Sequence, residues 1–90
     1  MPDDVVRLTV PADADLASVV VAALGALTRS AGFPAATVDQ VRERAAGAYL
    51  NVLERGTGER VEIEAWAQRP EWFFEMQRSG HTETHRSADG

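Results

Sequence analysis

The chain has 90 residues, of which 44% are hydrophobic and 26% charged, and it carries a formal charge of −5 at pH 7. This length and composition predict a single globular domain with one modest core. Because so short a domain buries a small share of its surface, we expect it to gain stability from a partner chain. No run of Lys or Arg stands out, which argues against a nucleic-acid partner, since phosphate neutralisation needs a basic surface.

The chain contains no cysteine, which excludes disulfides, thiolate catalysis and cysteine-based zinc sites. The first residues, Met1 to Asp4, are acidic and differ from the basic start of a signal peptide. The most apolar stretch, Val19 to Leu27, is far shorter than the roughly 20 residues of a membrane span. We therefore expect a cytoplasmic protein that does not insert into a membrane.

The first third of the chain predicts a strand followed by a helix. Val5 to Val10 is rich in β-branched residues and partly alternating, and Pro11 stops it. Asp13 or Asp15 can cap the helix that follows, which we expect to end at Gly32. Apolar residues recur in this helix at the spacing of an amphipathic stripe: Leu16, Val19, Val20, Ala23, Leu24 and Leu27.

The middle of the chain predicts a second amphipathic helix, from Thr37 to Arg55. Thr37 and Gln40 form the Thr-x-x-Gln pattern of a capping box, and Arg55 in the last turn suits the helix dipole. The segment Gly56-Thr57-Gly58 indicates where this helix ends. Its apolar stripe consists of Val38, Val41, Ala45, Ala48, Tyr49, Val52 and Leu53.

Two further strands are expected after this helix, and they close a hairpin. Val61 to Trp66 alternates between apolar and acidic residues, and Trp72 to Gln77 follows a turn at Arg69-Pro70-Glu71. The rest of the chain is almost entirely polar. We therefore expect one domain over residues 1–80 and a flexible polar tail over residues 81–90.

The order strand, helix, helix, strand, strand favours an α+β fold in which both helices cover one face of the sheet, a two-layer sandwich. Such a sheet leaves at least one edge unpaired, and an uncovered edge invites a partner strand. Alternation places Trp72 and Phe74 on one face of the hairpin and Phe73, with Trp66, on the other. Since only one face meets the helices, Trp66 and Phe73 are candidate interface residues.

The first strand, with Val6, and the first helix form a second candidate interface. Gly25 in the first helix and Gly47 in the second indicate a close approach between helices or to a partner chain, because a glycine inside a helix costs about 1 kcal/mol relative to alanine. The string His-Thr-Glu-Thr-His at residues 81–85 differs in spacing from a zinc-protease helix, so we expect no native metal site. A homodimer or a complex with another protein is expected.

Four segments also follow one another in a specific order: Leu8-Thr9-Val10-Pro11-Ala12-Asp13, Ala31-Gly32-Phe33-Pro34, Thr37-Val38-Asp39-Gln40-Val41-Arg42 and Asn51-Val52-Leu53-Glu54-Arg55-Gly56. Together they resemble the anti-sigma-factor serine kinases of the histidine-kinase-type, or GHKL, ATPase superfamily. In that family a strand ending in Pro-Ala, a long helix and a Gly-aliphatic-Pro turn lead to the nucleotide-binding helix. The resemblance covers about residues 5–80 and implies the N-terminal half of that ATPase fold.

The same resemblance implies that the parts which handle ATP are altered. The magnesium-binding Asn of the family matches Asn51, but Gly47 stands where the family has its catalytic Glu, and glycine supplies no base. The family's Asp-x-Gly, whose Asp contacts adenine, matches Arg78-Ser79-Gly80, so a permanent donor replaces an acceptor. The family's glycine-rich lid would follow Gly80. No catalytic residue is therefore expected, and Asn51 is at most a vestigial cofactor ligand.

From these residues we expect a catalytically inactive, anti-sigma-factor-like regulatory module that needs no cofactor. Its expected partner is a protein such as a sigma factor or an anti-anti-sigma factor. One alternative is a divergent serine kinase or ATPase that binds Mg-ATP through Asn51 and is completed by another chain. A second alternative is a small α+β homodimer of unknown role outside this family.

Overall fold

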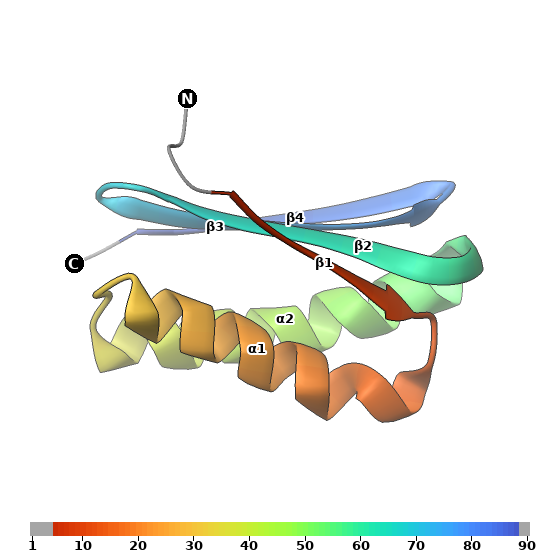
Figure 1. Ribbon diagram of the computed structural model, residues 1–90, viewed down its shortest axis with the longest axis horizontal. Helices are drawn as coiled ribbons and strands as arrows, with labels where there is room; N and C mark the ends of the chain where they lie inside the picture. The colour runs from red at the N-terminus through yellow and green to blue at the C-terminus, as the bar shows by residue number, and fades with distance from the viewer. Residues whose placement is uncertain (1–4, 89–90) are drawn as a thin grey trace.

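The computed structural model describes residues 5–88, which form an α+β fold of two layers. Two helices, α1 (Ala17–Ser30) and α2 (Ala35–Arg55), pack side by side on one face of a four-stranded antiparallel sheet (Figure 1). The predicted α+β class is therefore confirmed. The strands lie across the sheet in chain order: β1 (Val5–Pro11), β2 (Thr57–Gln68), β3 (Glu71–Ser79) and β4 (His81–Ala88).

The fourth strand corrects the expectation for the C-terminal segment. The sequence predicts a flexible tail over residues 81–90, but β4 pairs with β3 from His81 to Ala88, and residues 89–90 lie outside the described part of the chain. The prediction was wrong because β4 is polar on both faces, so it lacks the hydrophobic alternation that identifies a strand. The turn into β4 depends on Gly80, whose φ of 88° favours glycine.

Two predicted boundaries also shift. The second helix begins at Ala35 after Pro34, and Thr37 lies buried in its first turn, where its N–H donates to the carbonyl of Pro34. The capping box predicted at Thr37 and Gln40 is therefore wrong. Asp13 does cap, as predicted, but it caps a short 3-10 turn before α1 by accepting the N–H of Asp15 at 2.9 Å.

The core lies between the helices and the two central strands. Along β3, Trp72, Phe74 and Met76 are buried beneath the helices while Phe73 points to the opposite face, as the alternation predicts. The core also contains apolar residues of β2 and of both helices: Val61, Ile63 and Ala65 from β2, and Val20, Leu24, Val41, Ala45, Tyr49 and Val52 from the helices. Among the described residues, neither helix is both long enough and apolar enough to cross a membrane.

A buried tyrosine ties the end of β1 to α2. The hydroxyl of Tyr49 lies 2.8 Å from the carbonyl oxygen of Asp13 and 3.0 Å from that of Pro11. It also accepts the N–H of Asp13 at 3.4 Å. Because Tyr49 is fully buried, these contacts give its hydroxyl the partners that a buried polar group needs.

Candidate functional site

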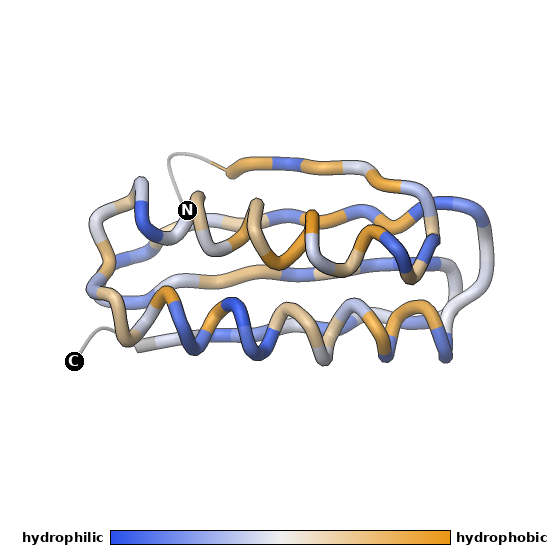
Figure 2. The backbone as a smooth tube through the Cα atoms, turned by 90° about the horizontal axis from the view of Figure 1, so that it is seen from below, coloured by the Kyte–Doolittle hydropathy of each residue, from blue (hydrophilic) through white to orange (hydrophobic). Residues whose placement is uncertain are grey.

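The two helices cover the two edges of the sheet unequally. Seen from the helix side, β1 runs outside α1, whereas β4 runs behind α2 (Figure 2). The inward side chains of β1, namely Val6, Leu8 and Val10, are therefore only half-buried. Their neighbours across the ladder on β2, Ala65, Ile63 and Val61, are fully buried. The core is thus incomplete on the β1 side.

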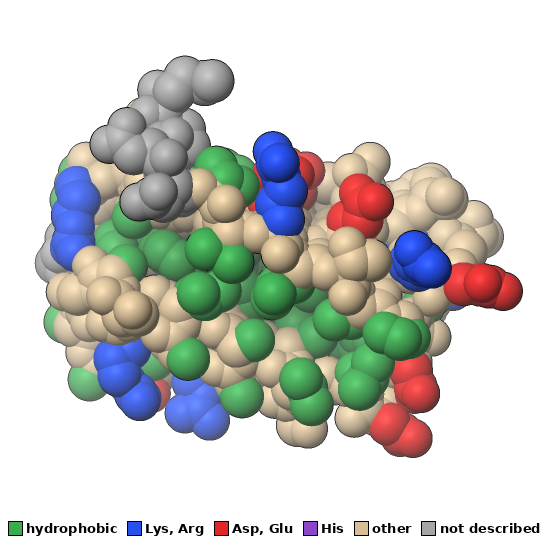
Figure 3. All heavy atoms as spheres, in the orientation of Figure 1, with side chains coloured by type: hydrophobic (Ala, Val, Ile, Leu, Met, Phe, Trp, Pro, Cys, Tyr) green, Lys and Arg blue, Asp and Glu red, His purple; other side chains and the backbone are tan. Residues whose placement is uncertain are grey.

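Apolar residues of α1 extend this incomplete region. Leu27 and Ser30 line a hollow together with Val6, which shows that their side of α1 faces β1. The helical spacing places Val19 and Ala23 on the same side, and 56% of Val19 is exposed. Figure 3 shows hydrophobic side chains gathered between β1 and α1. We call this region the β1 edge surface, made of Val6, Leu8, Val10, Val19, Ala23 and Leu27.

The backbone of β1 presents hydrogen-bonding groups at the same edge. The register pairs Val10 with Val61 and Pro11 with Arg60, and one step further the N–H of Ala12 donates to Glu59 at 2.8 Å. Since alternate residues of an antiparallel strand bond to the same neighbour, the even-numbered residues of β1 bond to β2. The N–H and C=O groups of Arg7 and Thr9 therefore point away from the sheet.

Pro11 agrees with this assignment. It occupies an outward position, where a residue without an N–H costs no ladder bond. Its carbonyl, which points away from β2, is the one that Tyr49 and the N–H of Asp13 contact. The edge available to a partner strand consequently ends at Thr9.

The opposite edge, β4, is polar and lies against α2, although His81, Glu83 and His85 on its helix-facing side are also only half-buried. Its helix-facing side chains include His81 and Glu83, whose imidazole and carboxylate lie 2.5 Å apart. On the open face, Arg86 pairs with Glu71 at 2.9 Å. Charged side chains on an edge strand discourage the addition of another strand.

A row of large side chains crosses the open face of the sheet near the β2–β3 turn. Trp66 and Phe73, the predicted interface pair, stack with ring centroids 5.4 Å apart and planes 6° apart. The register places Val5 beside Trp66 and Arg86 beside Phe73. Both aromatic rings are half-buried, so they cover each other as well as forming an apolar strip on this face.

The two helix glycines have different surroundings. A Cβ at Gly25 would lie 2.8 Å from Cγ of Arg42, so the missing side chain lets the aliphatic stem of Arg42 pack across α1. Gly25 is thus buried between α1 and α2 within one chain. A Cβ at Gly47 would meet nothing within 4 Å. The close approach between the helices that the sequence indicates therefore occurs at Gly25 and not at Gly47.

A hollow between α2 and β4 contains the positions that the family resemblance singles out. Gly47 and Asn51 line it from α2, and Glu83 and His85 line it from β4. The amide nitrogen of Asn51 donates to the carboxylate of Glu83 at 3.3 Å. Burial, reinforced by the guanidinium of Arg44, lowers the pKa of His85. Asn51 is therefore directed at a carboxylate on β4. Within residues 5–88, no group of His, Asp and Glu side chains could hold a metal ion.

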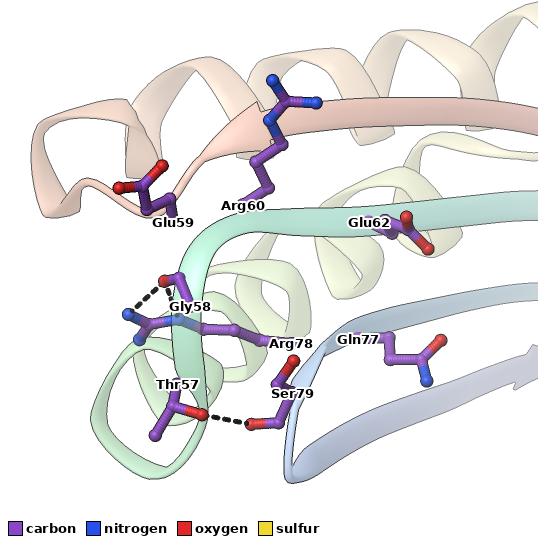
Figure 4. A pocket seen from close by; sticks show the side chains of 8 residues that line it. All are labelled: Thr57, Gly58, Glu59, Arg60, Glu62, Gln77, Arg78 and Ser79. Carbon is purple, nitrogen blue, oxygen red and sulfur yellow. Dashed lines mark hydrogen bonds between the residues drawn. The ribbon is translucent and has the colours of Figure 1, made fainter.

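Arg78, at the position of the family's adenine contact, binds backbone carbonyls. Its guanidinium donates to the carbonyl of Gly58 at 2.7 and 2.9 Å (Figure 4). It also donates to the carbonyl of Leu53 at 2.7 Å. Leu53 lies in the last turn of α2, where carbonyls lack a helical partner. The hollow beside Arg78 opens where the β2–β3 register shifts between Thr57 and Glu62. Arg78 thus closes the end of α2 and the base of the hairpin.

The sequence indicates the first strand, with Val6, and the first helix as a candidate interface, but it does not single out the other residues of the β1 edge surface. Leu8, Val10 and Leu27 belong to patterns that normally indicate core residues. One signal was present, because the consecutive run Val19 to Val21 is more apolar than a single buried helix face requires. The direction of the backbone groups of β1 depends on its pairing with β2, which the sequence does not specify.

Comparison with known proteins adds no family to this geometry. No protein-family model matches the chain, and no curated protein matches it significantly.

Proposed function

We propose that the chain is a regulatory protein-binding module that docks its partner on the β1 edge surface. The observation that carries this proposal is the combination of half-buried apolar side chains with outward backbone groups along one strand. Arg7 and Thr9 offer N–H and C=O groups to an added strand, and Leu8 and Val19 offer apolar area beside them. An added strand gains affinity from main-chain bonds and specificity from side-chain contacts.

The resemblance to the anti-sigma-factor kinases suggests the class of partner, a sigma factor or an anti-anti-sigma factor. On this proposal the chain corresponds to the N-terminal half of the histidine-kinase-type ATPase fold and has no catalytic role. The surroundings of two positions support it. Gly47 offers no carboxylate, and the guanidinium of Arg78 is occupied by carbonyl oxygens.

The alternative, Mg-ATP binding through Asn51, requires the hollow between α2 and β4. The carboxylates that line this hollow, Glu43 and Glu83, would repel a triphosphate, and Arg44 is the cation that lines it. Asn51 would also have to leave Glu83. Isothermal titration with Mg-ATP separates the proposals, because micromolar binding by the purified chain would support the alternative and contradict a module without a cofactor.

Nuclear magnetic resonance titration tests the docking surface directly. Purified sigma factors and anti-anti-sigma factors from the same organism are added to the isotope-labelled chain. We expect amide signals of β1 and α1 to shift, and those of β4 to stay in place. If these proteins bind and the shifts fall instead on β4 or on the aromatic row, the β1 edge surface is the wrong site.

Two exposed residues supply a matched pair of variants. Val19 on α1 is 56% exposed and belongs to the β1 edge surface, whereas Leu50 on α2 is 51% exposed and lies outside it. Val19→Lys should weaken partner binding at least tenfold, since it places a charge in an apolar contact. Leu50→Lys should leave binding unchanged. Equal effects of both substitutions would mean that the loss reflects general surface charge.

A further inference from the structure

We infer that the occupant of the β1 edge surface is a second copy of this chain, paired antiparallel through β1 with a two-fold axis at Leu8. This inference rests on the proposed function in using the same surface, and it implies that a second copy competes with a sigma factor or an anti-anti-sigma factor for the β1 edge surface. It requires that the edge be complementary to itself in side chains, backbone groups and charge.

The side chains meet this requirement. With the axis at Leu8, a residue of one β1 faces a residue of the other β1 when their two numbers add up to 16. Leu8 then faces Leu8, and Val6 faces Val10, so the half-buried apolar residues of both chains contact one another. Arg7 faces Thr9, so no like charges are opposed. Apolar cross-strand pairs stabilise a sheet, whereas opposed like charges destabilise it.

The backbone groups meet it as well. Arg7 and Thr9 both direct N–H and C=O groups outward, and in this register they face each other across the axis. Each Arg7–Thr9 pair can therefore exchange both hydrogen bonds, as alternate pairs of an antiparallel ladder do. The next outward residue, Pro11, has no N–H and its carbonyl contacts Tyr49, so the pairing ends there.

The neighbouring registers are poorer. An axis at Arg7 opposes the two Arg7 side chains and places Val10 beyond the start of the partner's β1. An axis at Thr9 places Arg7 opposite Pro11, which leaves the carbonyl of Arg7 without a donor. An axis between two residues would place each outward residue of β1 opposite a residue whose N–H and C=O already bond to β2, so no ladder bonds could form between the copies. The register at Leu8 keeps both helix layers on one face, where the apolar stripes of α1 can extend the contact.

An engineered disulfide tests this register, because the chain has no natural cysteine. In this register Leu8 forms a pair without hydrogen bonds, with Cα atoms about 4.5 Å apart, and disulfides span about 4.4–6.8 Å. Leu8→Cys should therefore form a covalent dimer on mild oxidation. Thr9→Cys should not, because its copies are offset by roughly 7 Å along the strand in addition to the strand spacing. A covalent dimer of Thr9→Cys without one of Leu8→Cys would overturn the register.

Matched proline variants test the edge without a cross-link. Thr9→Pro removes an outward N–H that β2 does not use, so the monomer should fold. On β4, the turn pairs Arg78 with His81, so Thr84 also points its N–H outward. By analytical ultracentrifugation the native chain should have twice its 9.8 kDa mass. Thr9→Pro should raise the dimer dissociation constant about tenfold or more, and Thr84→Pro should not change it.

The outcomes separate this inference from the proposed function. A native chain that is monomeric at high micromolar concentration, with no Leu8→Cys cross-link, overturns the dimer. If β1 amides of that monomer still shift when a sigma factor is added, the proposed function stands, and only the inference that a second copy occupies the β1 edge surface is wrong. A dimer that Thr84→Pro weakens and Thr9→Pro does not would place the contact at the other edge, which also overturns the inference.

Discussion

The two edges of the sheet, β1 and β4, both present outward backbone groups, yet they differ in the chemistry of their side chains and in how the nearer helix lies against them. The helix-facing residues of β1 are aliphatic and half-buried, because α1 lies partly inside the edge (Figure 2). Those of β4, such as Glu83 and His85, are polar and lie over α2. Free backbone groups alone do not define a docking edge. The difference teaches that the adjoining side chains decide whether a further strand is favoured or opposed.

Tyr49 provides the strongest test of how β1 is held. Tyr49→Phe removes a buried hydroxyl and leaves the carbonyls of Pro11 and Asp13 without this partner. We expect unfolding free energy to fall by about 1–3 kcal/mol, and hydrogen exchange of β1 to increase more than that of β4. Chemical denaturation and exchange measured by nuclear magnetic resonance check both. The control is Ser87→Ala, which removes a buried hydroxyl from β4. Equal loss of protection at both edges in Tyr49→Phe would contradict a local anchor.

Arg78 has the corresponding role at the β3–β4 end. Arg78→Lys keeps the charge but loses the planar fork that reaches the carbonyls of Gly58 and Leu53. The expected loss of unfolding free energy is about 1 kcal/mol, with fraying of the last turn of α2 and no change in β1. Arg60→Lys, in the same hollow, is the control and should have little effect on stability. If both substitutions destabilise equally, the carbonyl contacts of Arg78 are not what matters.

The central part of the fold follows from its sequence pattern, whereas the edges do not. The stripe of α2 and the alternation of Trp72, Phe73 and Phe74 identify the core because one face is buried and the other is not. The polar strand β4 lacks that contrast. The role of Tyr49 is also hidden, because an apolar stripe does not reveal that its hydroxyl meets the end of β1. The outward direction of Arg7 depends on strand register, which tertiary pairing determines.

Substitution of Gly47, on the helix that lies against β4, should have a smaller effect, and it should raise the unfolding free energy rather than lower it. A Cβ at this position would meet nothing within 4 Å, so Gly47→Ala should raise unfolding free energy by about 0.5–1 kcal/mol through helix propensity. Gly25→Ala should gain less, because its Cβ would crowd the stem of Arg42. Thermal denaturation measures both variants. Partner binding should survive Gly47→Ala, and loss of binding would show that the α2–β4 hollow takes part in docking.

The smallest expected effect is a loss of folding stability in acid that arises from His85 at the β4 edge. Burial, with Arg44 second, lowers the pKa of His85 below its ordinary value of 6.5. The unfolded chain therefore binds a proton at a higher pH than the folded chain, so this residue makes stability fall as pH drops below about 6.5, until the lowered pKa of the folded state is reached. His85→Gln should remove that component. Urea denaturation of both proteins at about pH 7.5 and about pH 5.5 measures it. The native chain should lose more stability than the variant, and equal losses would show that His85 is not perturbed. On the β1 side, Val6, Leu8 and Val10 have no ionisable group, so the part of the acid response that His85 causes belongs to the β4 edge alone.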